Sequence, residues 1–251
     1  MTQVIKIGGR PQTDPSLPGL IAEAWDAVAG AIVVHGGGDE ISALQQSMGA
    51  TAQFVDGRRV TTAQDVELVR MALSGTANKR LVSALVHEGV RAVGISGEDA
   101  SLIAAIPVDA VRMGHVGAPQ RVNGSLLLHL IDGGYLPVVS PVSRNVGLEL
   151  GPALNVNADD AAAAIAVAIE ADELTLVSDV PGVLVDQKPV ELLSIGRARA
   201  LMKDGTASGG MHAKLVAAIT AVEGGVARVR ITDLGGIKDR ARGTLIVPGT
   251  E

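Results

Sequence analysis

Two glycine-rich segments near the start of the chain have the residues needed to bind an anion. Lys6–Gly9 and His35–Gly38 hold two and three consecutive glycines, and each follows a short apolar run. Because glycine has no Cβ, backbone N–H groups there can approach an anion closely, and a helix after the second segment would add its positive N-terminal dipole. Lys6 could hold a phosphate oxygen beside them. Neither segment has the spacing of a Walker A loop or of the dinucleotide-binding fingerprint.

Three later segments carry polar residues at expected strand ends or helix starts. Asn155–Asp159 precedes an Ala-rich run that predicts a helix over Ala161–Ile169, and Asn and Asp would ordinarily be helix caps there. Ser178–Gly182 follows an apolar run. In Gly209–Lys214 a glycine pair precedes a predicted helix that carries Lys214 in its first turn, where a positive charge opposes the helix dipole. A lysine in that place needs a functional reason.

Short apolar runs alternate with amphipathic stretches along the chain, which predicts an α/β fold with a mostly parallel central sheet. Leu17, Ile21 and Trp25 share one face of a predicted helix, and Thr62 is a candidate N-cap for another. We therefore expect a three-layer αβα sandwich made of two closely joined lobes. The expected strands are Val4–Ile7, Ala31–Val34, Ala92–Ser96, Leu136–Ser140, Leu174–Val177 and Val229–Thr232.

Two turn signals interrupt this alternation. The first is Asp56–Gly57 and the second is the glycine-containing segment Gly114–Gly117. Each lies between short apolar runs, a pattern that predicts a β-hairpin. We expect the two hairpins to form a flap beside the sheet.

The composition excludes several classes of protein. The 251 residues are 47% hydrophobic with a net charge of −6, so the chain can bury a sizeable core and has no basic field for nucleic acid or an anionic membrane. It has no Cys, which excludes thiolate metal sites and cysteine nucleophiles. The longest apolar run, Ala161–Ile169, is about half of the ~20 residues that span a bilayer. Met1–Pro15 has no continuous apolar segment typical of a secretory signal, so we expect a cytoplasmic protein.

Seven short motifs can be read together as one ordered set. They are Lys6–Gly9, His35–Gly38, Gly57–Thr61, Gly75–Lys79, Asn155–Asp159, Ser178–Gly182 and Gly209–Lys214. This set covers nearly the whole chain and resembles the N-acetylglutamate kinases of the amino-acid kinase superfamily. The resemblance implies ATP-dependent phosphorylation of the side-chain carboxylate of N-acetyl-L-glutamate. The products would be N-acetylglutamyl 5-phosphate and ADP, in the second step of arginine biosynthesis.

The resemblance also implies a role for each matching residue. Lys6 and Lys214 match the two lysines that hold the transferring phosphoryl group, and Asp159 matches the carboxylate that organises them. The acceptor carboxylate is already ionised at pH 7, so the reaction needs no general base. Arg59 would grip an acceptor carboxylate with its planar guanidinium. The other expected acceptor-binding residues are Gly37, Gly38 and Asn155, and the expected nucleotide-binding residues are Gly8, Gly9, Ser178, Asp179, Val180, Gly182, Thr206, Ala207 and Ser208.

The family pattern further implies how the chain is organised. Residues 1–170 would form a lobe that binds acetylglutamate and makes the dimer, and residues 171–251 would form the lobe that binds ATP. ATP would enter with Mg²⁺ as the substrate complex, without a tightly bound cofactor or a protein metal ligand. Arginine-inhibited hexamers of the family carry a helix before the first strand, whereas Lys6 stands five residues from the start here. We therefore expect an arginine-insensitive homodimer.

The chain departs from the family pattern at a few positions, and two other functions stay open. Asp39 stands where many relatives have Pro, Arg58 stands where Leu is usual, and Thr62–Gln64 replaces a more acidic stretch. One alternative is another kinase of the superfamily, acting on carrier-bound aminoadipate, aspartate, glutamate, carbamate or a nucleoside monophosphate. The other is a non-catalytic domain that senses an amino acid. Among the histidines, His35 is a candidate for positioning its glycine segment.

Overall fold

The computed structural model describes residues 1–28, 30–49, 51–55, 58–147 and 151–249, and its centre is an eleven-stranded sheet. All six predicted strands form. Their bounds are β1 (Thr2–Ile7), β2 (Gly30–His35), β5 (Ala92–Gly97), β8 (Leu136–Asn145), β10 (Glu173–Val177) and β14 (Arg228–Thr232). These strands run parallel to one another in the order β14, β10, β1, β2, β8, β5. The predicted mostly parallel sheet is confirmed.

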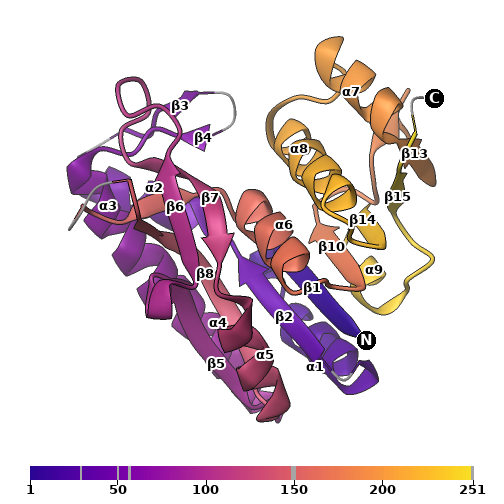
Figure 1. Ribbon diagram of the computed structural model, residues 1–251, viewed down its shortest axis with the longest axis horizontal. Helices are drawn as coiled ribbons and strands as arrows, with labels where there is room; N and C mark the ends of the chain where they lie inside the picture. Colours follow the sequence, from indigo (N-terminus) through magenta and orange to yellow (C-terminus); the bar gives the residue numbers. More distant parts are fainter. Residues whose placement is uncertain (29, 50, 56–57, 148–150, 250–251) are drawn as a thin grey trace.

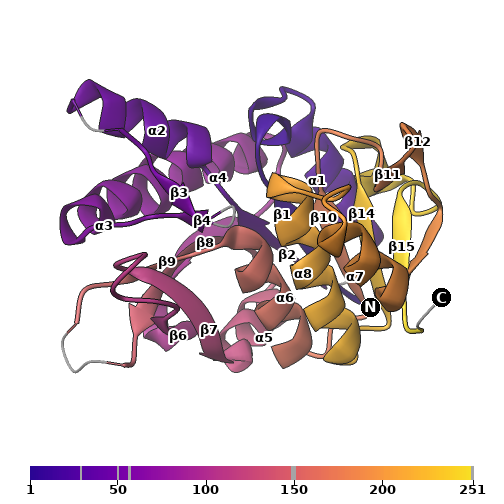
Figure 2. The same ribbon diagram turned by 90° about the horizontal axis from the view of Figure 1, so that it is seen from above.

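Helices cover both faces of the sheet, as Figures 1 and 2 show. Along β1 the side chains alternate between two separate cores, with Val4 in one and Ile5 in the other, and both residues are fully buried. This arrangement confirms the predicted three-layer sandwich. Helices α5 (Gly124–Asp132), α6 (Ala158–Ala168) and α8 (Gly209–Glu223) pack on the first core, and α1 (Leu17–Ala27), α4 (Asn78–His87) and α9 (Gly235–Lys238) pack on the second.

A long helical segment begins after Thr62, as predicted. Helix α3 (Ala63–Val69) starts with a capping box, in which Thr62 Oγ1 accepts a hydrogen bond from Asp65 N at 3.2 Å. Asp65 Oδ2 accepts one from Thr62 N at 2.9 Å. The segment then continues as a π-helix over Arg70–Ala77 before α4 begins. The apolar spacing predicts an ordinary helix here, and the difference is informative because π-helical turns are often found at functional sites.

The two predicted hairpins form, and they contact each other. The first is β3 paired antiparallel with β4, and its turn residues, Asp56–Gly57, lie outside the described residues. The second is β6 paired antiparallel with β7. Because β6 also pairs with β8 and β7 with β9, this hairpin belongs to the central sheet, and the expectation that it forms a flap beside the sheet is wrong. An isolated bridge between Thr61 and Gly114 joins the two hairpins. The bounds are β3 (Phe54–Val55), β4 (Arg58–Arg59), β6 (Ile103–Pro107), β7 (Val116–Val122) and β9 (Leu154–Val156).

The remaining elements complete the two ends of the sandwich. Beyond β14 the sheet ends with β15, which pairs antiparallel with β14, and β13, which pairs parallel with β15. Among the described residues, no helix has both the length and the apolar character that crossing a membrane requires. The bounds are α2 (Gly38–Ser47), β11 (Leu184–Val185), β12 (Lys188–Pro189), β13 (Leu192–Ser194), α7 (Ile195–Lys203) and β15 (Thr244–Val247), with 3₁₀ turns at Arg10–Thr13 and Asp99–Ser101.

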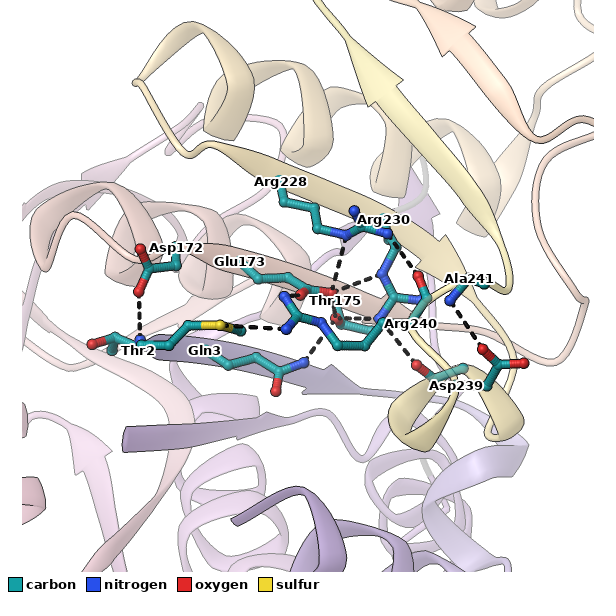
Figure 3. Close-up of polar contacts among 12 residues, drawn as sticks. Thr2, Gln3, Asp172, Glu173, Thr175, Arg228, Arg230, Asp239, Arg240 and Ala241 are labelled. Carbon is teal, nitrogen blue, oxygen red and sulfur yellow. Dashed lines mark hydrogen bonds and ion pairs between the residues drawn. The ribbon is translucent and has the colours of Figure 1, made fainter. Parts of the chain in front are cut away.

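A buried ionic cluster joins the amino ends of β10 and β14 (Figure 3). Glu173, the first residue of β10, is fully buried, and its Oε1 accepts a hydrogen bond from Arg230 Nε at 2.7 Å. Arg240 donates a hydrogen bond to the other carboxylate oxygen. Arg230 also donates to the carbonyl oxygens of Arg242 and Gly236, at 2.8 Å and 3.0 Å. The paired charges and filled hydrogen bonds explain how these groups can be buried.

Candidate active site

Asp159 lies between the two lysines that the sequence motifs single out. Its Oδ1 is 2.8 Å from Lys6 Nζ, and its Oδ2 is 3.5 Å from Lys214 Nζ. Lys6, Asp159 and Lys214 are only 5%, 4% and 9% exposed. The structure therefore brings together three charged side chains from β1, α6 and α8, which are far apart in the sequence.

The local structure explains how Lys6 and Asp159 reach this point. Lys6 is the penultimate residue of β1, and its side chain folds over Gly8, where a Cβ would lie 2.4 Å from Lys6 Nζ. Position 8 must therefore be glycine for the lysine to take this path. Asp159 lies in the first turn of α6, whose N-cap Asn157 accepts a hydrogen bond from Asp159 N at 2.8 Å. The expected cap is present, and it fixes the backbone of the central carboxylate.

The position of Lys214 in its helix differs from the one expected from the sequence. The glycine pair Gly209–Gly210 does not precede α8 but forms its first two residues, because Ser208 already has the extended backbone of an N-cap. Lys214 therefore stands in the second turn of the helix, not in the first. Its charge is balanced by the Asp159 carboxylate, which supplies the reason that a lysine near a helix start requires.

Burial and mutual attraction set the charges of this group. Burial lowers the pKa of Lys6 from 10.5 to about 8, because Asp159 raises it less than burial lowers it and Lys214 lowers it further. Burial alone would raise the pKa of Asp159, but the two lysines outweigh burial and hold its pKa below the ordinary value. Asp159 is thus ionised at neutral pH, with its two carboxylate oxygens paired to the two ammonium groups. With both lysines protonated, the three residues carry one excess positive charge.

These residues form the floor of a cleft of about 860 Å³ at the carboxyl ends of the parallel strands. Three helices, α2, α6 and α8, begin at its wall, and their first turns line it through Gly38, Ala158 and Gly210 respectively. Helix N-termini carry unpaired N–H groups and a positive partial charge. Together with the two lysines, they make the cleft suited to binding a polyphosphate and a second anion.

Arg59 is held firmly at one side of the cleft. The residue is 7% exposed, and its Nη2 donates hydrogen bonds to Ser42 Oγ at 2.6 Å and to the Gly38 carbonyl at 2.9 Å. Its Nη1 donates to Gln45 Oε1, and its guanidinium lies 4.8 Å from the centre of the Phe54 ring. Sequence reasoning missed this support. The signal was present, because positions 38, 42 and 45 fall on one face of a helix.

His35 positions the backbone of the second glycine segment, as its place in the sequence suggested. Its Nδ1 lies 2.7 Å from the Gly36 carbonyl oxygen, and Asn78 Nδ2 lies 3.0 Å from its Nε2. Asn78 Nδ2 also donates to Val138 O at 2.9 Å. Burial lowers the pKa of His35 to about 4, so the ring is neutral, with Nδ1 as donor and Nε2 as acceptor. The contribution of the Gly75–Lys79 motif is therefore indirect, since its Asn78 holds His35, which in turn contacts the glycine segment at the cleft.

The other expected residues fall mostly on the cleft wall. Asn155, from β9, lines the cleft and donates a hydrogen bond to Thr61 Oγ1 at 3.0 Å. Gly182 does not line the cleft. It is buried, and a Cβ there would lie 2.6 Å from Thr244 Oγ1, so its glycine serves close packing. The remaining expected residues on the wall are Gly8, Gly9, Gly37, Gly38, Ser178, Asp179, Val180, Thr206, Ala207 and Ser208.

The family is settled by comparison with known sequences. The sequence profile of the Amino acid kinase family matches residues 1–233. The chain belongs to the amino acid kinase family. This family member is 42% identical over 239 residues to the acetylglutamate kinase of Chloroflexus aurantiacus, across 94% of this chain and 93% of the relative. It is also 42% identical over 255 residues to the acetylglutamate kinase of Methanopyrus kandleri, across 97% and 99% of the two chains.

Solved structures agree with the fold of this amino acid kinase. A Streptococcus mutans UA159 protein superposes with a TM-score of 0.89 at 28% identity, covering 100% of this chain and 99% of that one. The carbamate kinase of Giardia lamblia, bound to citric acid, superposes with a TM-score of 0.77 at 17% identity, covering 99% and 98% of the two chains. The second likeness concerns the fold alone.

Proposed function

We propose that this protein transfers the γ-phosphoryl group of ATP to the side-chain carboxylate of N-acetyl-L-glutamate, as an acetylglutamate kinase of arginine biosynthesis. The observation that carries the proposal is the buried group of Lys6, Asp159 and Lys214 at the floor of the cleft. The full-length identity of about 42% with acetylglutamate kinases supports the choice of acceptor.

In this reaction an oxygen of the acceptor carboxylate attacks the γ-phosphorus. The bond from that phosphorus to the oxygen shared with the β-phosphorus breaks, and ADP leaves with the electron pair. No proton has to move, because the acceptor is already ionised. The difficulty is to bring two anions together. Lys6 and Lys214 would offset the charge that spreads over the phosphoryl oxygens in the transition state, and Asp159 would hold both ammonium groups in place.

The acceptor and nucleotide subsites follow the two halves of the cleft wall. We place the acceptor near Arg59, Asn155 and the Gly37–Gly38 backbone, and the nucleotide near Ser178–Val180 and Thr206–Ser208. The first set comes from residues before 170 and the second from residues after 170. This distribution supports an acceptor-binding lobe over 1–170 and an ATP-binding lobe over 171–251, with Lys6 and Asp159 from the first lobe and Lys214 from the second.

Mg²⁺ would arrive with ATP as part of the substrate. Among the residues that the structure describes, no three His, Cys, Asp or Glu side chains form a metal cluster. The one carboxylate at the centre of the site, Asp159, is already paired with two lysines. We assign phosphate oxygens and water as its ligands, because Mg²⁺ keeps several waters and is held largely through substrate phosphates in kinase sites. The homodimer remains part of this proposal on the basis of family resemblance, and the cytoplasmic location remains part of it on the basis of the sequence.

The acceptor is tested by comparing substrates. Purified protein is incubated with MgATP and one of N-acetyl-L-glutamate, L-glutamate, L-aspartate or carbamate, and ADP release is followed at matched concentrations. We expect N-acetyl-L-glutamate to give the highest kcat/KM by at least about a hundredfold, since a site that hydrogen-bonds its substrate discriminates strongly against one that lacks the partner group. Turnover with another acceptor but not with N-acetyl-L-glutamate would refute the substrate assignment while keeping the kinase.

A further inference from the structure

Arg58 connects the β3–β4 hairpin to α6 beside the central carboxylate. Its Nη2 lies 2.7 Å from Asp160 Oδ2, and the two side chains are 27% and 14% exposed. In the sequence Arg58 precedes Arg59 and Asp160 follows Asp159. One ion pair therefore joins the immediate neighbours of the proposed acceptor-binding arginine and of the lysine organiser.

The space around this ion pair is only partly filled. Arg58 lines the main cleft on one side and a second cavity of about 330 Å³ on the other. Asp160 lines the second cavity as well, together with His212 and Val216 of α8. Because a cavity lies behind the arginine, side-chain packing is looser at this point than in a filled core. The ion pair is a direct contact between the described residues of the hairpin and α6.

The described residues of the hairpin are attached to other elements as well. Each of its strands has two residues, and Phe54 at its start is 59% exposed. Arg59 attaches the hairpin to α2, and Thr61 is attached to β9 through Asn155. A two-stranded hairpin of this length is not stable by itself. Backbone hydrogen bonds of Thr61 with Met113 and His115 tie its end to the β6–β7 connection, whereas the contact of Arg58 with α6 is made by side chains.

The charges around Asp160 also favour a fixed pair. Burial and the neighbouring Asp159 hold the pKa of Asp160 above its ordinary value, and Arg58 is the largest influence that favours the ionised form. Without Arg58, a second carboxylate would stand beside Asp159 with no cation bonded to it. Such a group would disturb the balance of charge on which the lysine positions depend.

We propose that Arg58 and Asp160 are a positioning pair that sets Arg59 at the correct distance from the Lys6, Asp159 and Lys214 group, and so governs the binding of the acceptor. The inference rests on the proposed function, in which Arg59 binds the acceptor. Neither member of the pair has to touch a reacting atom. Their effect is expected on the acceptor and not on ATP, since the expected nucleotide residues follow β1, follow β10 or precede α8, and none lies on the β3–β4 hairpin.

The test is a double-mutant cycle with Arg58→Met, Asp160→Asn and the double variant. Each single variant is expected to raise the KM for the acceptor about tenfold, to leave the KM for ATP within about twofold, and to change kcat by less than about threefold. Because the two residues act as one unit, the double variant is also expected to raise the KM for the acceptor about tenfold, and not a hundredfold. Arg58→Lys keeps the positive charge, so its increase in the KM for the acceptor should be at most about half of the increase in Arg58→Met.

A matched control comes from the ion pair between Arg199 of α7 and Glu223 of α8, whose side chains are 58% and 51% exposed, away from the hairpin. Arg199→Met and Glu223→Gln should leave both KM values unchanged. Equal increases in the KM for ATP and for the acceptor, multiplying effects in the double variant, or no rescue by lysine would each overturn the positioning role. If the wild-type protein turns over no N-acetyl-L-glutamate, the proposed function fails instead.

Discussion

Lys6 Nζ and Asp159 Oδ1 lie 2.8 Å apart in a place almost closed to water. The contact joins the end of the first strand to the start of a helix more than 150 residues later, and Lys214 completes it from a third element. A charge pair so buried is costly unless both members stay paired. Because the pair lies in a cleft and burial makes it costly, we attribute it to the chemistry of the site more than to the stability of the fold.

Removal of the central charge is expected to abolish most of the activity. In Asp159→Asn the two lysines lose their shared counter-ion, so the pKa of Lys6 falls further and its ammonium is no longer held toward the cleft. We expect kcat to fall by about a hundredfold or more, in line with the loss of one preorganised charged group. The exposed Asp172, changed to Asn, is the control and should keep kcat within about twofold. Equal activities for the two variants would contradict the assigned role.

The activity should fall on the alkaline side of neutrality. The pKa of Lys6 is about 8 in the folded protein and 10.5 ordinarily, so its positive charge is present below pH 8 and is lost as the pH rises through that value. Because kcat/KM reports the free enzyme, the kcat/KM for ATP should decrease with an apparent pKa near 8. Lys6→Arg, which stays protonated, should lose this alkaline decrease whatever its residual rate. A kcat/KM for ATP that is constant up to pH 10 in the wild-type protein would rule out a lowered lysine pKa.

Lys214 and Arg59 should affect different kinetic constants. In the proposed reaction, Lys214→Ala removes a contact to the transferring group, so we expect kcat to fall about a hundredfold with little change in the acceptor KM. Arg59→Ala removes a contact to the bound acceptor, so its acceptor KM should rise about tenfold or more while kcat changes less.

The controls for this comparison are Lys203→Ala and Arg91→Ala. Lys203 is exposed at the end of α7, and Arg91 stacks on the Tyr135 ring at 4.0 Å, much as Arg59 stacks on Phe54. Neither change should alter the kinetics. If Lys214→Ala and Arg59→Ala shift kcat and KM in the same proportion, the division between phosphoryl and acceptor contacts is wrong.

The stability of the fold should depend on the buried ionic cluster of Glu173 and Arg230, which lies away from the cleft. Glu173→Gln leaves Arg230, which is 1% exposed, without its counter-charge, and breaking such a buried pair costs about 3–5 kcal/mol. The free energy of unfolding in urea should fall by that amount, with both KM values unchanged in the folded protein. Glu223→Gln breaks an exposed pair and should cost less than about 1 kcal/mol. Equal losses for the two variants would contradict this account of the cluster.

The main layers of the fold could be predicted from the sequence because their signals are local. Apolar runs such as Val4–Ile7 mark buried parallel strands, and the Thr62 capping box marks the start of a helix. The resemblance of the ordered motifs to a known family also predicted that residues 6, 159 and 214 belong together. The structure adds the distances that join them.

The parts that could not be predicted depend on contacts between distant segments. The π-helix over Arg70–Ala77 packs against Gly37, where a Cβ would meet Leu73 at 2.5 Å, and no apolar spacing encodes that approach. The Arg58 to Asp160 pair joins residues 102 positions apart. The segment with Gly182 has the composition of a ligand-binding loop, yet that glycine serves packing against Thr244.

The central claim is that a carboxylate oxygen of N-acetyl-L-glutamate becomes bonded to the γ-phosphorus of ATP. The most direct test uses N-acetyl-L-glutamate with ¹⁸O in both oxygens of its side-chain carboxylate, MgATP and hydroxylamine. Hydroxylamine attacks the acyl phosphate at its carbonyl carbon, which frees phosphate and leaves a hydroxamate. Mass spectrometry should find one ¹⁸O in the phosphate and one in the hydroxamate. ADP formed together with phosphate that carries no ¹⁸O would contradict the account.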